Sequence, residues 1–568
     1  MPDNRNPFEY GQATHLSREE MLLYYIEDYN YSRFVSSKRN VFLVGERGTG
    51  KTMTFLYYSL PVQVEKCKKQ HDELDLSMVS IYVPCNTPLY HRKEYELLDE
   101  LNAALISEHF LVGSMMYALI DAIYSVANIM TPDEENNLRK ELEYIFNIEL
   151  LNNIPFISAF KHVIDKSCIS MQRAINENED IRESFFLFNN GIKSVLGCFS
   201  QLAKLSNSHF SFMIDDAQLL NRFQIRSLNS WIAFRDNALF SFKVATTRVD
   251  APPLITSSGG SILEGHDFTK IEMEQPYQNK WSSFGKLAQR IIESRLRSVN
   301  IEKTPHEFFP ENPVVTEGLK KAKIKAEQQA HEKYPDGTSK QISDYVYKYT
   351  RAIYFRERSS KANLPDYSGF EVLTHLSTGV IRNLLDPCFH MYDSMLSESR
   401  VVDFIPPKIQ TDVIRNLSKK KWDFVQNLLD NTIEGCSRMQ GQYVFHLLDN
   451  LAILFWKRLQ KEISEPRAVE FTISGLDEYR HKELIKIINI AQKAQLIYTY
   501  KSSAKDSGKR EVYYMPNRML WPERGLDPYG QHARVSITAD NLQNAAITNR
   551  EIPFLGDAND EPNLFTTT

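Results

Sequence analysis

The stretch Asn40-Val-Phe-Leu-Val-Gly-Glu-Arg-Gly-Thr-Gly-Lys-Thr-Met-Thr54 decides the fold of this chain. Four apolar residues, Val41 to Val44, predict a buried parallel strand. This strand runs into Gly45-x-x-x-x-Gly50-Lys51-Thr52, and a helical pattern follows. A strand, a glycine-rich loop and a helix in this order are the context of a phosphate-binding loop. The alternative, a chance glycine-rich turn, explains neither the preceding strand nor the following helix.

Each part of this loop has a role in holding a nucleoside triphosphate. The glycines let the backbone curl so that its N–H groups point at an anionic phosphate. Lys51 adds a positive charge to the β- and γ-phosphates, and the Thr52 hydroxyl is placed to ligate Mg²⁺. The residues predicted to bind the nucleotide are Gly45, Glu46, Arg47, Gly48, Thr49, Gly50, Lys51, Thr52 and Met53.

Composition narrows the remaining classes of function. The chain has 568 residues, 42% of them hydrophobic and 24% charged, which is typical of a globular protein of about three or four domains. Its net charge of −5 excludes a global polycation, so any nucleic-acid surface must be local. Six scattered cysteines without a C-x-x-C pair argue against a zinc site and a disulfide framework. They favour a reducing compartment, so we expect a cytoplasmic protein.

Neither end of the chain nor its interior indicates a membrane. The first residues lack the apolar core of a signal peptide, and no apolar run approaches about 20 residues. We therefore expect no membrane contact.

Paired acids follow a second apolar run. The stretch Phe210-Ser-Phe-Met-Ile predicts a strand that ends in Asp215 and Asp216, and an earlier strand is expected over 78–85. An apolar strand ending in two acids is typical of the Walker B motif, which places Asp215 beside the phosphate loop to hold Mg²⁺. Asp216 is then the candidate to orient or deprotonate the attacking water. A helix N-cap explains Asp216 alone but not the pair.

A further strand, Phe240 to Ala245, ends in a polar tip, and a fifth strand is expected over 270–274. The tip falls at the carboxyl edge of the sheet, where a γ-phosphate would lie. Thr246 or Thr247 is positioned to hydrogen-bond the attacking water, and Arg248 to neutralise charge on the γ-phosphoryl group. The alternative for Arg248 is a solvated charge that caps the strand.

Several segments lie outside this series of strands. Residues 93–207 predict helix after helix, which indicates an insertion in addition to a crossover. Residues 301–367, with the lysine run Lys320–Lys325, predict a surface insertion with a solvated face. Phe8 and Tyr10 precede the first helix and are candidates either for base contacts or for core aromatics.

The C-terminal third predicts a lid and a winged helix. A glycine turn, Thr378-Gly379, precedes Arg382 and suits an arginine delivered over the nucleotide from a lid. Helices after residue 406 lead to two strands, 497–500 and 511–515, which is the layout of a winged helix-turn-helix. Ten Lys and Arg stand against four Asp and Glu between residues 480 and 524, as a DNA-contacting wing requires. A protein-docking wing is the alternative.

These motifs together resemble AAA+ ATPases of the origin-recognition/Cdc6-like group and the allied STAND NTPases. The resemblance implies an α/β fold: a P-loop parallel sheet of order 5-1-4-3-2 with a large helical insertion, an α-helical lid and a C-terminal winged-helix domain. It assigns Thr246 and Thr247 to the sensor 1 position and Arg382 to the sensor 2 position. Arg248 would act in cis as an arginine finger, and the candidates for a finger from a neighbouring subunit are Arg222, Arg226 and Arg235.

The resemblance also sets the expected function. Domains are expected over 1–300 (ATPase core), 301–400 (insertion and lid), 401–533 (winged helix) and 534–568 (a partly ordered tail). The expected ligands are ATP and Mg²⁺, with slow hydrolysis because Asp216 stands where many relatives carry Glu. One interpretation is a switch that associates with duplex DNA through the winged helix. The other is a signalling or antiphage-defence ATPase that self-associates or assembles with an effector encoded elsewhere.

Overall fold

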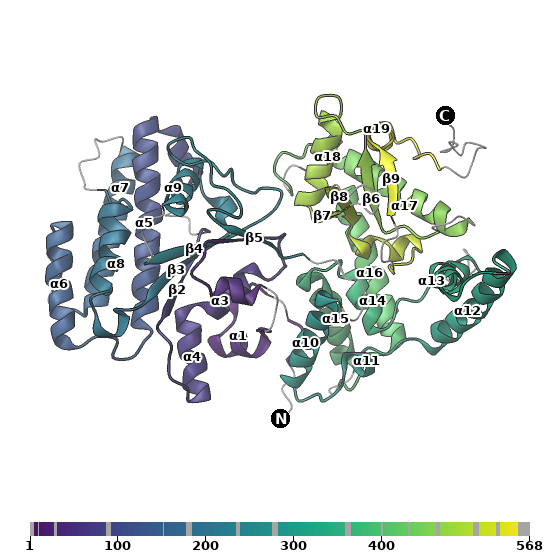
Figure 1. The fold of residues 1–568 in the computed structure, drawn as a ribbon, viewed down its shortest axis with the longest axis horizontal. Coiled ribbons are helices and arrows are strands. Elements are labelled where there is room, and N and C mark those ends of the chain that lie inside the picture. The colour runs from purple at the N-terminus through teal and green to yellow at the C-terminus, as the bar shows by residue number, and fades with distance from the viewer. Residues whose placement is uncertain are drawn as a thin grey trace. The chain divides into compact units, whose positions relative to one another are not determined.

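The computed structural model describes residues 5–9, 11–27, 31–86, 92–151, 153–177, 185–234, 239–274, 282–357, 365–398, 402–429, 432–461, 466–503, 510–529 and 534–554. Contacts divide the chain into two units. The N-terminal unit is Gly11–Met273, and the C-terminal unit is Glu274–Thr568 together with Met1–Tyr10 (Figure 1).

A parallel sheet of five strands forms the centre of the N-terminal unit. Its strands are β1 (Val41–Val44), β2 (Met78–Pro84), β3 (His209–Asp215), β4 (Phe240–Thr246) and β5 (Thr269–Glu272). The order is β2-β3-β4-β1-β5, and every neighbouring pair is parallel. This arrangement confirms the predicted α/β fold and the predicted strand order.

Alternate residues of each strand face opposite sides of the sheet. On one side Leu43, Met213 and Ala245 pack with Phe55 of α3 (Lys51–Tyr58), the helix that follows the phosphate-binding loop. The helices of this unit outside the insertion are α1 (Arg18–Tyr24), α2 (Ser32–Val35), α3, α4 (Leu60–Gln70) and α9 (Arg222–Ala233). The α3 helix is therefore fixed against the sheet directly behind the loop.

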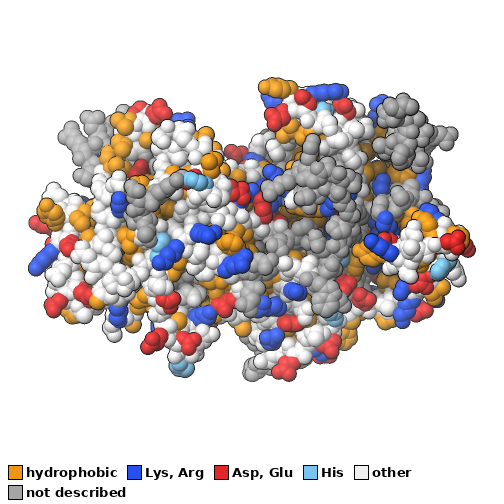
Figure 2. Space-filling view, in the orientation of Figure 1, with side chains coloured by type: hydrophobic (Ala, Val, Ile, Leu, Met, Phe, Trp, Pro, Cys, Tyr) orange, Lys and Arg blue, Asp and Glu red, His pale blue; other side chains and the backbone are white. Residues whose placement is uncertain are grey.

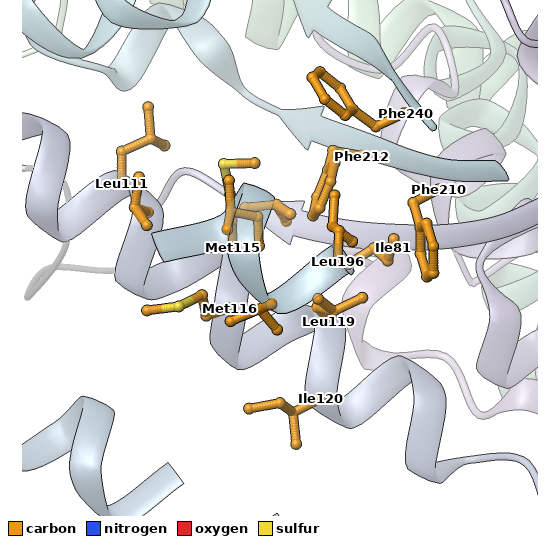
Figure 3. Close-up of a cluster of buried hydrophobic side chains, with 14 of the residues drawn as sticks. Ile81, Leu111, Met115, Met116, Leu119, Ile120, Leu196, Phe210, Phe212 and Phe240 are labelled. Atoms are coloured by element: carbon orange, nitrogen blue, oxygen red, sulfur yellow. The ribbon is translucent and has the colours of Figure 1, made fainter. Parts of the chain in front are cut away.

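The opposite side of the sheet is covered by the helical insertion. Figure 3 shows side chains of α5 (Glu100–Tyr124) in the same buried cluster as Phe210 and Phe212 of β3 and Phe240 of β4. The other helices of the insertion are α6 (Pro132–Phe146), α7 (Phe156–Glu177) and α8 (Ser194–Phe199). The prediction of helices over 93–207 is confirmed, and these helices share one core with the sheet.

One helix among the described residues, α5, is long and apolar enough to cross a membrane by length and composition. Within it, 72% of the most apolar window is buried inside the protein, as in a core helix.

The C-terminal unit begins with helices. They are α10 (Ser283–Arg297), α11 (Pro305–Phe308), α12 (Pro313–Lys333), α13 (Ser339–Arg356), α14 (Phe370–Leu376), α15 (Ile381–Glu398) and α16 (Pro407–Gln426). The lysines of the run 320–325 are exposed on α12, whereas Ala322 and Ala326 on its opposite side are buried in the core of the unit. The predicted surface insertion is thus an ordered pair of helices.

A winged-helix fold follows. It consists of α17 (Arg438–Gln460), β6 (Glu470–Ser474), α18 (Lys482–Lys493) and the hairpin of β7 (Ile497–Ser503) and β8 (Arg510–Pro516). The segment assigned to a tail from its composition adds β9 (Arg534–Thr538), which pairs parallel with β6, and α19 (Ala539–Thr548), which packs on α17 and α18. The small residues Ala545 and Ala546 of α19 are buried. A count of large apolar residues does not register such small buried residues, so the composition of this segment indicated a tail.

The first residues of the chain belong to the C-terminal unit. Phe8 is fully buried against Phe308, Phe309 and Tyr392, so it is a core aromatic and not a free base contact. Arg295 of α10 donates hydrogen bonds to the carbonyls of Pro7 (3.0 Å) and Glu9 (2.8 Å). These contacts join the first residues of the chain to α10. Tyr10 lies outside the described residues.

Candidate nucleotide-binding site

The phosphate-binding loop connects β1 to α3 at the carboxyl edge of the sheet. Gly48 and Gly50 have φ angles of 91° and 97°, and Gly50 is the residue that precedes the first turn of α3. A Cβ on Gly45 would lie 2.8 Å from the Met273 Cβ and 2.9 Å from the Thr49 Oγ1. The loop therefore needs glycine for its backbone conformation at two positions and for close packing at a third.

The lysine of the loop is buried against the loop itself. Lys51 is 6% exposed, and its Nζ donates to the carbonyls of Gly45 and Glu46. The Thr49 hydroxyl donates to the same Glu46 carbonyl at 2.9 Å. A positive charge is thus held at the centre of a backbone curve, where an anion would bind.

Asp215 lies at the carboxyl end of β3, and its carboxylate is almost fully buried, at 2% exposure. The Tyr82 hydroxyl donates to Oδ2 at 3.1 Å, whereas Oδ1 has no hydrogen-bond partner among the described residues. Burial, and then the charge of Asp216, raise the pKa of Asp215 to about 6, against opposing effects of Thr52, Tyr82 and Lys51. A buried carboxylate that lacks a partner for one oxygen, beside a threonine hydroxyl, is a suitable ligand pair for a hard cation.

Asp216 has a left-handed backbone conformation, with φ 55° and ψ 43°. Such a conformation is uncommon outside glycine, although aspartate tolerates it better than most residues. Its Oδ1 accepts a hydrogen bond from the Gln218 Nε2 at 2.9 Å. The turn after β3 therefore holds one oxygen of the Asp216 carboxylate through Gln218.

The end of β4 lies directly beside the loop. The Gly45 N–H donates to the Thr246 carbonyl at 3.1 Å, and the Thr246 hydroxyl donates to the Thr247 carbonyl at 3.3 Å. Thr247 is 6% exposed, and its hydroxyl oxygen has no hydrogen-bond partner within the described part of the chain. Of the two sensor 1 candidates, Thr247 has the hydroxyl that is available to a ligand.

Arg248 is joined to the loop and to β5. Its backbone N–H donates to the Glu46 Oε1 at 3.2 Å, and its guanidinium forms an ion pair with Glu272. The structure thus places Arg248 at the predicted edge of the sheet. The predicted contact with a γ-phosphate stays a prediction, and it requires the guanidinium to exchange its partner.

The remaining candidates lie elsewhere. Arg382 is exposed in the first turn of α15, in the C-terminal unit. Arg222 is exposed and Arg226 is half-buried on α9, while Arg235 lies outside the described residues. Their roles stay predictions.

Sequence reasoning missed two polar partners in this site, Tyr82 and Glu272. Tyr82 lies on β2, whose register pairs Pro84 with Asp215, so it is close to the end of a neighbouring strand. Glu272 is the last residue of β5, opposite Val44 in the register. Polar residues near the carboxyl ends of the other strands of the sheet were the available signal.

The residues present fit a nucleotide with its magnesium ion. The glycine curve and Lys51 suit phosphate oxygens, and Thr52 with Asp215 suits a metal ion that also binds those oxygens. Among the described residues, no group of three or more His, Cys, Asp or Glu side chains is arranged to hold a metal by itself. A metal held here would therefore take its further ligands from water and from the phosphates.

Comparisons with known proteins show which family the chain resembles. One similar solved structure is the crystal structure of Cdc6p from Pyrobaculum aerophilum, with 10% identity, 96% coverage of each chain and a TM-score of 0.28. No curated protein matches the chain. The family model described as ORC-CDC6-like matches residues 6–537. The chain therefore belongs to the ORC-CDC6-like family of AAA+ proteins.

Proposed function

We propose that this protein binds ATP with Mg²⁺ and hydrolyses it slowly, as a nucleotide-controlled switch that associates with duplex DNA. The observation that carries the nucleotide part is the buried Asp215 carboxylate beside Lys51 and Thr52, with one oxygen available. A buried carboxylate with one oxygen that lacks a hydrogen-bond partner among the described residues costs stability, so its presence supports a function that requires a cation there.

Each residue of the site has a proposed role. Lys51 releases the loop carbonyls and holds the β- and γ-phosphate oxygens, while Thr52 and Asp215 hold the metal ion. Mg²⁺, when bound, supplies positive charge to the phosphate oxygens. Asp216 orients or deprotonates the attacking water, and Thr247 forms a hydrogen bond with that water. The low rate of hydrolysis follows from the shorter reach of aspartate compared with glutamate.

Replacement of Thr52 tests the metal site. We expect Thr52→Val to lose the Mg²⁺-dependent part of ATP affinity in calorimetric titrations, because valine keeps the shape of threonine but has no oxygen ligand. Thr52→Ser is the matched control and should keep that part. Equal Mg²⁺ dependence in Thr52→Val and wild type would contradict the proposed metal site.

The helix α18 supports DNA association, because it occupies the position of the recognition helix in the winged helix. Buried Leu484 and Ile487 anchor one side of α18 in the core of the unit. The other side carries polar residues spaced as one helical face, namely Lys482, Lys486, Asn489 and Lys493. Tyr479, 93% exposed, lies three residues before the first residue of this helix. Lysines on a helix that projects from a winged helix suit phosphate contacts.

A DNA contact would be local, because charges of both signs are mixed over the rest of the surface. Figure 2 shows basic and acidic side chains interspersed over the face in view, in agreement with the net charge of −5. The wing tip, with Lys505 and Lys509, lies outside the described residues, so α18 supplies the described candidates.

Charge reversal tests the DNA contact. We expect Lys482→Glu with Lys486→Glu to weaken binding to a fluorescein-labelled duplex by at least about tenfold, and to lower its salt dependence. The same change at the exposed Lys68 and Lys69 of α4 is the control and should have little effect. If wild type shows no salt-dependent binding to any duplex, DNA association is wrong.

A protein partner is the second candidate function, and the insertion favours it. Leu97, which is 87% exposed, lies just before α5, and Leu101, which is 68% exposed, lies in its first turn. Tyr144 is 88% exposed on α6. Exposed apolar residues on an inserted segment are typical of a protein interface. If DNA binding is absent and ATP changes only the sedimentation of the protein, the switch controls assembly with itself or with an effector.

A further inference from the structure

An ion pair joins the two strands that flank the phosphate-loop strand. In the sheet, β1 lies between β4 and β5, and its last residue, Val44, is opposite Thr246 of β4 and Glu272 of β5. Arg248, two residues beyond the end of β4, forms an ion pair with Glu272, the last residue of β5. The pair therefore connects the neighbours of β1 at the point where the loop begins.

The backbone of Arg248 is held by the loop itself. Its N–H donates to the Oε1 of the buried Glu46 at 3.2 Å. The carbonyl of Glu46 accepts a hydrogen bond from the Lys51 Nζ at 3.1 Å. Arg248 and Lys51 thus contact the same loop residue, the first through its carboxylate and the second through its carbonyl. The backbone of Arg248 is joined to the anion-binding curve, while its guanidinium is paired with the edge strand β5.

Glu272 holds this guanidinium weakly. Its Oε2 pairs with Arg248, and its Oε1 lies 2.6 Å from the Lys270 Nζ. Burial acts to raise the pKa of Glu272, but Arg248 and then Lys270 bring that pKa below its ordinary value, so the carboxylate is ionised at neutral pH. The Glu272 side chain is 45% exposed, and water screens such a pair until it contributes little. A phosphate group bound at the loop would offer the guanidinium a more strongly charged partner.

We infer that Glu272 competes with the γ-phosphate of ATP for Arg248, so that the guanidinium has one partner with ATP and the other with ADP. The inference rests on the proposed function, in which the loop binds the nucleotide. ATP carries a third phosphoryl group that displaces Glu272, whereas ADP leaves the ion pair in place. Glu272 is therefore a specificity-determining residue that acts through Arg248 and lowers the preference for ATP over ADP. After hydrolysis Glu272 takes the guanidinium back, which gives the switch two discrete arrangements.

A double-mutant cycle on nucleotide affinity tests the competition. Glu272→Gln keeps the size of the side chain and removes its charge. We expect it to tighten Mg²⁺-dependent binding of a β,γ-imido analogue of ATP by about threefold to fivefold, because the pair that must be broken is partly exposed. Affinity for ADP should stay within about 1.5-fold of wild type. In an Arg248→Ala background, Glu272→Gln should change the affinity for the analogue by less than about 1.5-fold, because the arginine is gone.

The Arg248→Ala background also separates competition from a simple effect of charge. Loss of a negative charge near the loop would favour ATP in any background, whereas competition requires the arginine. Lys270→Gln is the matched control on the same strand, because it removes the other partner of Glu272 and leaves Arg248 in place. It should not tighten binding of the analogue. Glu272→Asp, with its shorter reach, is a second variant in case Glu272→Gln does not fold, and it should tighten binding by a smaller factor; thermal melts establish folding.

The sign of the Glu272→Gln effect decides the role of Glu272. Tighter binding of the analogue that is absent in the Arg248→Ala background supports competition. Weaker binding would mean that Glu272 positions Arg248 for ATP, and equal tightening in both backgrounds would mean a general charge effect; either result overturns the inference. It is also wrong if Arg248→Ala alone leaves the affinity for the analogue unchanged. The proposed function fails on a different result, namely nucleotide binding by Lys51→Ala that equals that of wild type.

Discussion

The hydroxyl of Tyr82 on β2 donates a 3.1 Å hydrogen bond to the carboxylate of Asp215 on β3. This contact joins neighbouring strands at the carboxyl edge of the sheet, which also carries the phosphate-binding loop. It stabilises the ionised form of a carboxylate whose pKa burial has raised to about 6. Tyr82 thereby helps to keep Asp215 ionised near neutral pH, which is the form that binds a metal ion.

We expect Tyr82→Phe to weaken Mg²⁺-dependent ATP binding most strongly near pH 6. Loss of the hydrogen bond raises the pKa of Asp215 further, so protons compete with the metal ion at higher pH. The affinity should fall by about threefold to tenfold near pH 6 and much less well above it. Calorimetric titrations over a pH series check this, and a pH profile identical to that of wild type would show that the Tyr82 hydroxyl does not tune Asp215.

Asp215→Asn is expected to stabilise the protein at neutral pH while it removes Mg²⁺-dependent binding. The folded-state pKa of about 6 lies above the ordinary value of 3.8, so this carboxyl favours folding fully below pH 3.8 and loses that contribution as pH rises through 6. The loss amounts to at most about 3 kcal/mol, and asparagine avoids it.

Thermal melts near pH 7 and pH 4 measure this effect. The gain in stability should be about 1–3 kcal/mol at the higher pH and close to zero at the lower one. Asp133→Asn, at an exposed position of α6, is the matched control and should change stability little at either pH. A destabilised Asp215→Asn variant near pH 7 would contradict the cost assigned to this buried charge.

Gly45→Ala is expected to damage the phosphate-binding loop through a single methyl group. The new Cβ would lie 2.8 Å from the Met273 Cβ, so the loop or β5 must shift. We expect a loss of about 1–3 kcal/mol of stability together with weaker ATP binding. Gly11→Ala, where no atom lies within 4 Å of the added Cβ, is the control. Unchanged melting and binding in Gly45→Ala would mean that the loop is looser than described.

Phe8→Ala distinguishes a core aromatic from a base contact. Because Phe8 is fully buried among aromatic rings of the C-terminal unit, its truncation should cost about 3–5 kcal/mol of stability. ATP affinity, measured well below the melting temperature, should stay within about twofold of wild type. A specific loss of ATP affinity without a loss of stability would restore the base-contact interpretation.

The sheet could be predicted because each strand is an apolar run with a polar tip. The strand at Val41–Val44 has the predicted bounds, and the tips of β3 and β4 carry Asp215 and Thr247 to the edge beside the loop. The helical face of α10 from Phe284 to Leu296 is likewise buried as its spacing predicts. Patterns of local periodicity determine these features.

Features that depend on distant partners could not be predicted. The burial of Phe8 requires residues some three hundred positions later, and β9 is a strand because β6 offers it an edge. The contact between Tyr82 and Asp215 depends on the register of β2 against β3. Thr378, in a left-handed conformation, accepts a hydrogen bond from the backbone N–H of the distant Arg518, which no local pattern indicates.

Mg²⁺-dependent ATP turnover in wild type and Lys51→Ala tests the central claim most directly. Lys51 is the buried cation of the loop, and Lys69, exposed on α4, supplies the matched Lys69→Ala control. We predict slow release of phosphate by wild type and by Lys69→Ala, and none above background by Lys51→Ala. Equal turnover in wild type and Lys51→Ala would contradict the claim that this loop is the catalytic nucleotide site.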